Sequence, residues 1–228
     1  MADPPKPRDR YPNAQGIATR QAIVVEAGRI FAERGYEGAS MRDIAEGSGA
    51  ALSSLVYHFK TKKNLYLAAI QHYVIAESKL DHHFRFFHDL NYDDHQAVVD
   101  AIRDSIRSFL EACHGPSANE ITLALYRRIM VESDVEALMM LLECFVPVQQ
   151  LLPQVIARIR PDFTEVDIGF WVQMYWSLLQ YTVMGKKLIL YDMQLGDEYP
   201  TAYLDEASWR FAQYCAAPLG LPEPTRYA

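Results

Sequence analysis

The chain has 228 residues, half of which are hydrophobic, and it carries a formal net charge of -7 at pH 7. This composition is enough for one large globular unit or for a small and a larger domain, and it excludes a disordered protein. The three cysteines lie far apart and form no CxxC pair, so we expect buried or inert thiols at Cys113, Cys144 and Cys215.

The spacing of apolar residues predicts helices along almost the whole chain, and no alternating strand pattern competes with them. The first helix is expected near 17–34 and ends before Gly35. Ser40 then caps a second helix of about two turns, which ends at Gly47 or Gly49. A third helix follows near 52–58, and Thr61 opens a fourth helix that continues to Ala76.

The rest of the chain is also expected to be helical, which predicts an all-α fold. Pro147 and Pro153 lie inside one of these helices and should kink or divide it. The expected helices lie near 93–113, 118–131, 134–159, 164–191 and 201–216.

Charge is distributed unevenly between the front and the rear of the chain. Residues 1–66 hold ten Lys and Arg against seven Asp and Glu, a balance of +3, and residues 67–228 hold the remaining twelve against twenty-two, a balance of -10. Only the front part therefore favours a polyanion. No secretory signal opens the chain, and Gln and Lys interrupt the most apolar run, 170–191, so we expect a cytoplasmic protein without a membrane span.

Two short helices joined by a glycine turn and followed by basic residues are typical of a helix-turn-helix. Counted from Met41, the small Ala45 is fifth, where the two helices touch, and Gly49 is ninth, in the turn. This spacing supports a compact three-helix unit that binds DNA.

The stretch FAERGYEGASMRDIAEGSG, followed by YHFKTKKNLY, resembles the TetR family of bacterial transcriptional repressors. The resemblance covers about the first third of the chain. It implies a helix-turn-helix DNA-binding domain at 17–66 and a larger helical domain for ligand sensing and dimerisation at 67–216. We expect a flexible arm at 1–16 and a flexible tail at 217–228.

Carried over residue by residue, the resemblance places Arg42 near base edges or phosphate and Ser40 at a helix cap that contacts phosphate. It places His58 and Lys62 at positions that contact the DNA backbone. The recognition helix is expected to expose Leu52, Ser53, Ser54 and Tyr57 to the major groove. Two residues depart from the family pattern, in which a tyrosine is usual at Val56 and a capping serine is common at Ala51.

Lys62 and Lys63 follow Thr61, at the amino end of a helix, where positive charge is mildly unfavourable. We interpret them, with the free N–H groups of that helix end, as a site for a DNA phosphate. The alternative is a solvated pair of lysines. Arg8, Arg10 and Arg20 are candidates for a basic arm that touches DNA, and the alternative for Arg8 and Arg10 is a solubilising tail.

The segment FWVQMYWSLLQYTVMGKKLIL is apolar around most of its circumference, so both of its sides must be covered. One side is assigned to the domain core and the other to a two-fold homodimer. One larger monomeric core is the alternative. The predicted interface residues are Val172, Leu179, Val183, Tyr203, Ala207, Phe211 and Tyr214.

Soft and aromatic side chains in the rear domain suit a small apolar or aromatic effector, although core packing is their more frequent use. The spacing of the histidines between His72 and His95 does not support a metal site, and no cofactor is expected. The predicted effector-binding residues are Met139, Met140, Phe145, Trp171, Tyr175 and Trp176.

Together these features predict a ligand-responsive transcriptional regulator, a repressor, that binds an inverted-repeat operator as a homodimer. Its two recognition helices would lie about 34 Å apart, and an effector would release the DNA by changing that separation. The alternative is an all-helical small-molecule carrier with a degenerate DNA-binding unit. The chain contains no GxSxG, P-loop, dinucleotide or HExxH motif, so we do not expect an enzyme.

Overall fold

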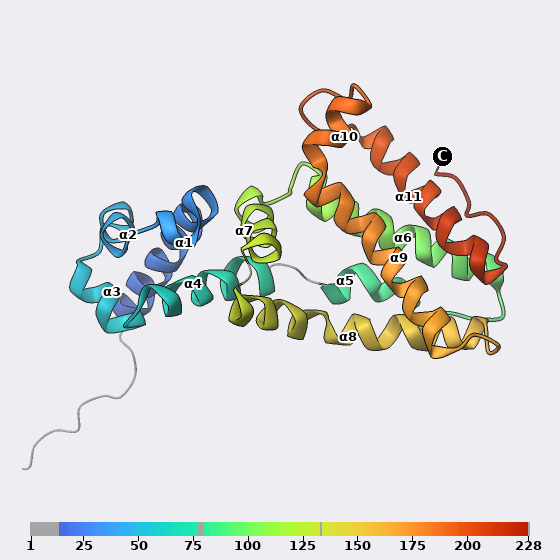
Figure 1. The fold of residues 1–228 in the computed structure, drawn as a ribbon, viewed down its shortest axis with the longest axis horizontal. Helices are drawn as coiled ribbons and strands as arrows, with labels where there is room; N and C mark the ends of the chain where they lie inside the picture. Colours follow the sequence, from blue (N-terminus) through green and yellow to red (C-terminus); the bar gives the residue numbers. More distant parts are fainter. Residues whose placement is uncertain (1–13, 77–79, 133, 228) are drawn as a thin grey trace, which may run out of the picture. The chain divides into compact units, whose positions relative to one another are not determined.

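The computed structural model describes residues 14–76, 80–132 and 134–227 (Figure 1). Most of these residues are helical, and none of them forms a strand. The proposed basic arm with Arg8 and Arg10 lies outside the described residues. The chain divides into two compact units between Tyr73 and Val74.

The first unit contains four helices that match the predicted order. They are α1 (Ala14–Gly38), α2 (Met41–Ser48), α3 (Leu52–Phe59) and α4 (Lys62–Ile70), and a π-helical turn (Gln71–Ile75) follows α4. One apolar face of α1 packs against the other three helices. The buried side chains at the centre of this core are Ile23, Ala27, Ile30, Phe31, Ile44, Leu55, Phe59, Leu65 and Tyr66.

Local capping explains where the short helices begin and end. The Ser40 hydroxyl accepts a hydrogen bond from the Asp43 N–H at 3.1 Å, and Gly49 ends α2 with a φ of 67°. A left-handed residue of this kind favours glycine. Thr61 caps α4 by accepting from the Asn64 N–H at 3.1 Å. Ala51 has the extended backbone of an N-cap but offers no side-chain oxygen to α3.

The first unit extends through Tyr73, past the boundary at residue 66 expected from the sequence. The Tyr73 ring lies against Gly28, where an added Cβ would come within 2.1 Å of it. Its hydroxyl donates to the Val25 carbonyl oxygen at 3.2 Å. Glycine therefore allows the end of this unit to pack closely onto α1.

The second unit is built around α6 (His95–His114), which packs most extensively against α11 (Thr201–Ala216). Its core also includes α8 (Val135–Ile159) and α9 (Glu165–Met184). Shorter segments complete it. These are α5 (Leu80–Phe84), a 3-10 turn (Arg85–Phe87), α7 (Glu120–Val131), α10 (Lys186–Asp192) and a second 3-10 turn (Ala217–Leu219).

Two predicted helix boundaries need correction. The helix expected at 164–191 ends at Met184 and restarts at Lys186, because Gly185 leaves the helical conformation between them (φ -94°, ψ 10°). The segment 80–87 is helical, although no helix was predicted there.

The helix α8 contains both of its prolines without being divided. Among the described residues, it is the one helix whose length and apolar composition would suffice to cross a membrane, a criterion that core helices of soluble proteins also meet.

The prediction of a loose tail at 217–228 is wrong for the residues that the structure describes. The Trp209 indole N–H donates to the Pro224 carbonyl oxygen at 2.8 Å, and the Thr225 N–H donates to an Asp100 carboxylate oxygen at 2.7 Å. These two hydrogen bonds connect the segment to α11 and α6. The tail is therefore part of the second unit.

Candidate nucleic-acid interface and ligand cavity

One face of α3 is exposed while the opposite face anchors it. Leu55 and Phe59 are buried in the core of the first unit. Leu52, Val56 and Tyr57 are 40%, 52% and 81% exposed. Because residues four apart share a side of a helix, this pattern gives α3 one continuous outward surface, to which exposed Ser53 also belongs.

Lysines gather at the start of α4. The Lys62 ammonium donates to the Ala39 carbonyl oxygen at 3.3 Å and lies 4.3 Å from the centre of the Tyr36 ring. The Lys63 ammonium lies 5.9 Å from the centre of the Tyr66 ring. Lys62 thus holds the start of α4 against the residues that precede α2, and an ammonium has three N–H donors, so this contact leaves room for a phosphate oxygen.

Other polar residues of the first unit have mixed environments. Arg42 is exposed in the first turn of α2, whereas Ser40 and His58 are half-buried. Ser54 is half-buried as well, so it belongs less to the outer face of α3 than predicted. Arg20 is exposed on α1, with its guanidinium 5.1 Å from the centre of the Phe59 ring.

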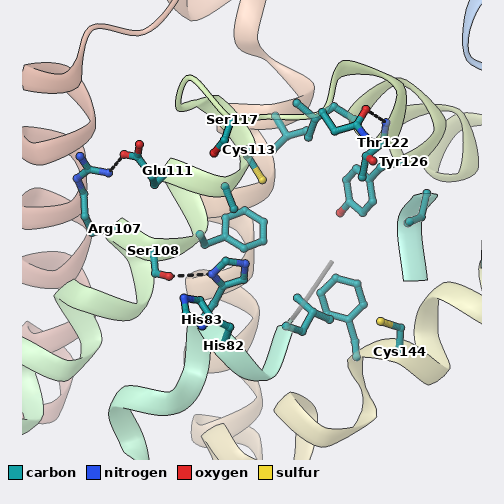
Figure 2. Close-up of a pocket in the computed structure, with 18 of the residues that line it drawn as sticks. His82, His83, Arg107, Ser108, Glu111, Cys113, Ser117, Thr122, Tyr126 and Cys144 are labelled. Carbon is teal, nitrogen blue, oxygen red and sulfur yellow. Dashed lines mark hydrogen bonds and ion pairs between the residues drawn. The ribbon is translucent and has the colours of Figure 1, made fainter. Parts of the chain in front are cut away.

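A cavity of about 860 Å³ lies in the second unit, among α5, α6, α7 and α8 (Figure 2). Its apolar wall comes from side chains of several helices that meet here. These are Val74, Leu80, Phe86, Phe109, Leu123, Leu141, Phe145 and Val183.

The charged groups that line the cavity are paired with groups of the chain itself. Arg107 donates through Nε to Asp205 at 2.6 Å and through Nη1 to Glu111 (Figure 2). Asp104 accepts a hydrogen bond from the Tyr227 hydroxyl at 2.8 Å. A further lining cation, Arg85, donates to a backbone carbonyl oxygen and lies with its guanidinium 4.2 Å from the centre of the Phe86 ring.

Two further polar groups of the cavity, a thiol and a phenol, are kept uncharged at neutral pH by burial. Burial raises the pKa of the Cys113 thiol and that of the Tyr126 phenol to about 12. The Tyr126 ring projects from α7 into the cavity (Figure 2). His83 lies on the opposite side, with Nδ1 2.8 Å from the Ser108 hydroxyl.

Residues 23–69 match the family model described as bacterial regulatory proteins, tetR family. The front part of the chain is therefore similar to the tetR family of bacterial regulatory proteins. The matching part includes the helices α2 and α3 and most of the core of the first unit.

Curated relatives in the TetR family match this front part only. The transcriptional repressor AcnR of Corynebacterium glutamicum is 46% identical over 50 residues, which are 22% of this chain and 27% of that protein. The activator FasR of Mycolicibacterium smegmatis is 38% identical over 55 residues, 24% of this chain and 25% of that protein. The matches thus span about a quarter of these relatives.

Solved structures extend the likeness to the whole fold. The fatty acid degradation regulator FadR of Bacillus halodurans has a TM-score of 0.58 at 16% identity, over 85% of this chain and 94% of that one. FadR of Bacillus subtilis, solved in complex with stearoyl-CoA, has a TM-score of 0.57 at 13% identity, over 84% and 97%. At these identities the likeness supports the two-domain all-α fold.

Most of the predicted effector-binding residues lie outside the cavity. Phe145 lines the cavity, but Trp171 and Tyr175 are buried in the core, where Trp171 donates to the Cys215 carbonyl oxygen at 2.8 Å. Met139 is 51% exposed on α8. Met140 and Trp176 are half-buried and do not line the cavity either.

Three of the predicted dimer residues are also corrected. Leu179, Val183 and Ala207 are buried within the second unit, so they have no surface to offer a partner. Because α9 is apolar around most of its circumference, its sequence pattern does not show which side the core covers. The other predicted interface residues keep some exposure: Val172, Tyr203 and Phe211 are half-buried, and Tyr214 is exposed.

The sequence reasoning missed most of the cavity. His83 and Phe86 come from the segment 80–87, which was not predicted to be helical. Tyr126 and Ser108 lie on predicted helices. They line the cavity only because of how those helices pack in the folded unit, which the sequence pattern does not show. The sequence indicates this cavity only weakly, through the phenol of Tyr126 on α7 and the hydroxyl of Ser108 on α6.

Proposed function

We propose that this chain is a transcriptional regulator, a repressor, that binds an inverted-repeat operator as a homodimer and releases it when a small molecule occupies the second unit. The observation that carries the proposal is the exposed face of α3, presented by a capped helix-turn-helix in the positively charged part of the chain. Two similar proteins, the repressor AcnR and the negative regulator IcaR of Staphylococcus aureus, support repression, whereas FasR is an activator.

The proposed DNA contacts divide into two kinds. Arg42, Lys62, Lys63 and the half-buried Ser40 and His58 are assigned to phosphates, which position the protein on the duplex. Base edges are assigned to the outward residues of α3. These are Leu52, Ser53 and Tyr57, with Ser54 at the border of the face.

Homodimerisation is assigned to the outer side of α9 and to α11. Phe170 and Tyr214 are 68% and 51% exposed there, so both have apolar surface that a partner copy could cover. A two-fold dimer would present two copies of α3 to successive major grooves.

The effector is assigned to the cavity, and the pairing of its charged groups defines the class of molecule. An anionic ligand would find Arg107 already neutralised by two carboxylates, and it would have to draw Arg85 away from a backbone carbonyl oxygen and the Phe86 ring. A cationic ligand would have to displace an existing partner from Asp104 or Glu111. The cavity therefore favours an uncharged, mainly apolar molecule with a polar group that faces the Tyr126 hydroxyl.

Selection of bound sites from random duplexes by the full-length protein tests the proposal. We expect an inverted repeat, bound with an affinity that falls as salt is raised. The alternative function, a small-molecule carrier with a degenerate DNA-binding unit, predicts ligand binding without any selected site. The departures from the family pattern at Val56 and Ala51 are the observations that favour this alternative.

Screening of small molecules for release of the selected DNA then tests the effector assignment. Uncharged molecules should dominate the active compounds, and a set dominated by carboxylates or phosphates would contradict the assignment. Tyr126→Phe should weaken binding of compounds that carry a hydrogen-bonding group by about three- to tenfold. Tyr181→Phe is the matched control, because Tyr181 is exposed on α9 and does not line the cavity.

A further inference from the structure

We infer that α3 reads its operator mainly through the methyl groups of thymine, so that each half-site must present thymines to Leu52 and Val56. This inference rests on the proposed DNA-binding function and specifies the chemistry of that same surface. It concerns which bases are recognised, whereas the proposed function concerns whether a specific DNA site is bound at all.

The residue types on α3 lead to this conclusion. Arg and Lys read guanine, and Asn and Gln read adenine, by pairs of hydrogen bonds in the major groove. The sequence of α3, LSSLVYHF, contains none of these four residues. Its outward face instead offers the apolar side chains of Leu52 and Val56, together with Ser53 and Tyr57.

The major groove offers one apolar group to such a face. Thymine carries a C5 methyl at the groove edge, whereas the other bases present hydrogen-bond donors and acceptors there. Leu52 and Val56 have no donor with which to satisfy those polar atoms, so burying them against a guanine or an adenine edge would cost free energy. Pairing each of them with a thymine methyl removes apolar surface from water on both sides.

The surroundings of this face favour DNA over a protein partner. Lys60 is exposed directly after α3, and exposed Arg42 lies on α2, which packs against it. Lys62 and Lys63 follow at the start of α4. An apolar strip bordered by cations suits a groove bordered by phosphates, in which the cations position the duplex and the strip supplies the sequence preference.

Local rigidity makes the contact selective. Leu55 and Phe59 are 0% and 4% exposed, so the inner side of α3 is fixed in the core. Val56 is branched at Cβ and has one strongly preferred rotamer in a helix, so its methyl groups occupy a defined place. A one-base shift of the DNA would therefore leave this side chain against a polar edge.

Thymine-to-uracil scanning of the selected operator tests the inference, because uracil lacks only the methyl group. Each thymine of a half-site is replaced in turn, and the affinity of the full-length protein is measured by fluorescence anisotropy. We expect one or two positions in each half-site where uracil weakens binding about fourfold, the effect of one buried methyl group. Other thymines should tolerate the change.

A double-mutant cycle assigns the contact to its residue. Val56→Ala removes the side-chain methyl groups at a position that is 52% exposed, so the fold should be retained. In this variant, the uracil penalty at one position should fall below twofold. Val25→Ala is the matched control, because Val25 is 42% exposed on α1, and this variant should keep the full penalty.

The outcomes separate the inference from the proposed function. A selected operator without a required thymine, or one in which uracil changes the affinity less than twofold at every position, would overturn the inference and leave the regulator intact. Failure to select any site would reject the DNA-binding function itself.

Discussion

Two polar side chains, those of His114 and Thr182, are buried together where α6 ends. The Thr182 hydroxyl donates its proton to the Leu179 carbonyl oxygen at 2.7 Å, so it must accept from Nε2 of His114, 3.0 Å away. Nδ1 of His114 then has no proton, and it has no hydrogen-bond partner among the described residues. Burial, with a smaller contribution from the positive charge of Lys186, lowers the pKa of His114 to about 4.

This histidine should make the second unit sensitive to acid. Because its pKa is lower in the folded state than in the unfolded chain, its contribution to stability is complete above the unfolded pKa of about 6.5 and is lost as the pH falls towards 4. Between pH 7 and pH 5, the free energy of unfolding should fall by about 2 kcal/mol on account of His114.

Urea unfolding followed by circular dichroism at both pH values measures this effect. His114→Gln should lose about 2 kcal/mol less than the wild type over the same interval, because glutamine does not titrate. His95→Gln removes an exposed histidine and should behave as the wild type. Equal losses in all three proteins would contradict the assignment.

Lys62 has both a structural contact and a proposed contact to DNA. Lys62→Ala removes the bond to the Ala39 carbonyl oxygen and the proposed phosphate partner. We expect weaker binding to every duplex and a slope of log affinity against log salt that is less steep by about 0.9. The control is Lys187→Ala, at an exposed lysine of α10, which should leave the slope unchanged. If Lys62→Ala also left the slope unchanged, Lys62 would not contact the DNA.

At the scale of single elements, α3 begins without a side-chain cap, unlike α2 and α4 beside it. Ala51 already has the cap conformation, with φ -65° and ψ 143°. Ala51→Ser should therefore add the missing hydrogen bond and stabilise α3 by about 1 kcal/mol. Hydrogen exchange of the α3 amides should slow about fivefold.

The same substitution inside a helix provides the control. Ala18 is exposed in α1, where serine has a lower helix propensity than alanine, so Ala18→Ser should not slow exchange. Faster exchange of α3 in Ala51→Ser would show that the cap conformation does not accept a serine hydroxyl.

The elements of the first unit were predictable because their signals are local. Ser40, Gly49 and Thr61 cap or end helices through atoms only a few residues away, and the structure confirms each of them. The break at Gly185 has no such signal, since the apolar pattern continues on both sides of it. The segment 80–87 is too short for helical periodicity to be recognised.

The cavity and the buried side of α9 depend on contacts between distant parts of the chain. Leu179 and Val172 have the same apolar character in the sequence, yet one is fully buried and the other half-buried. Arg107 reads as a surface residue, and only the fold brings it to Asp205. Sequence periodicity identifies apolar faces, but it does not say which neighbour covers each of them.

At the scale of the whole molecule, the proposed DNA binding depends on the separation of charge along the chain. The net charge of -7 would repel a polyanion if it were evenly spread. The positive balance of the front part and the acidic rear part instead favour contact through the first unit alone. This separation is consistent with a regulator whose second unit binds a partner copy and an effector.

The proposed homodimer can be disrupted by a single charge. Tyr214 is 51% exposed on α11, so Tyr214→Glu should leave the fold intact. In a two-fold dimer, both copies of the new carboxylate would lie in the apolar interface, and sedimentation velocity should show monomers. Tyr191→Glu, at a tyrosine that is 82% exposed on α10, should remain dimeric; two dimeric variants would argue against this interface.

The aromatic layer behind the cavity gives the protein an intrinsic optical reporter. The Trp176 ring centre lies 5.0 Å from that of Phe145 and 6.2 Å from that of Phe109, and both phenylalanines line the cavity. A molecule bound in the cavity would contact these phenylalanine rings. The tryptophan fluorescence of Trp176 should therefore shift on binding, without an attached dye. Ligand binding in the cavity should therefore be measurable by fluorescence in the unmodified protein.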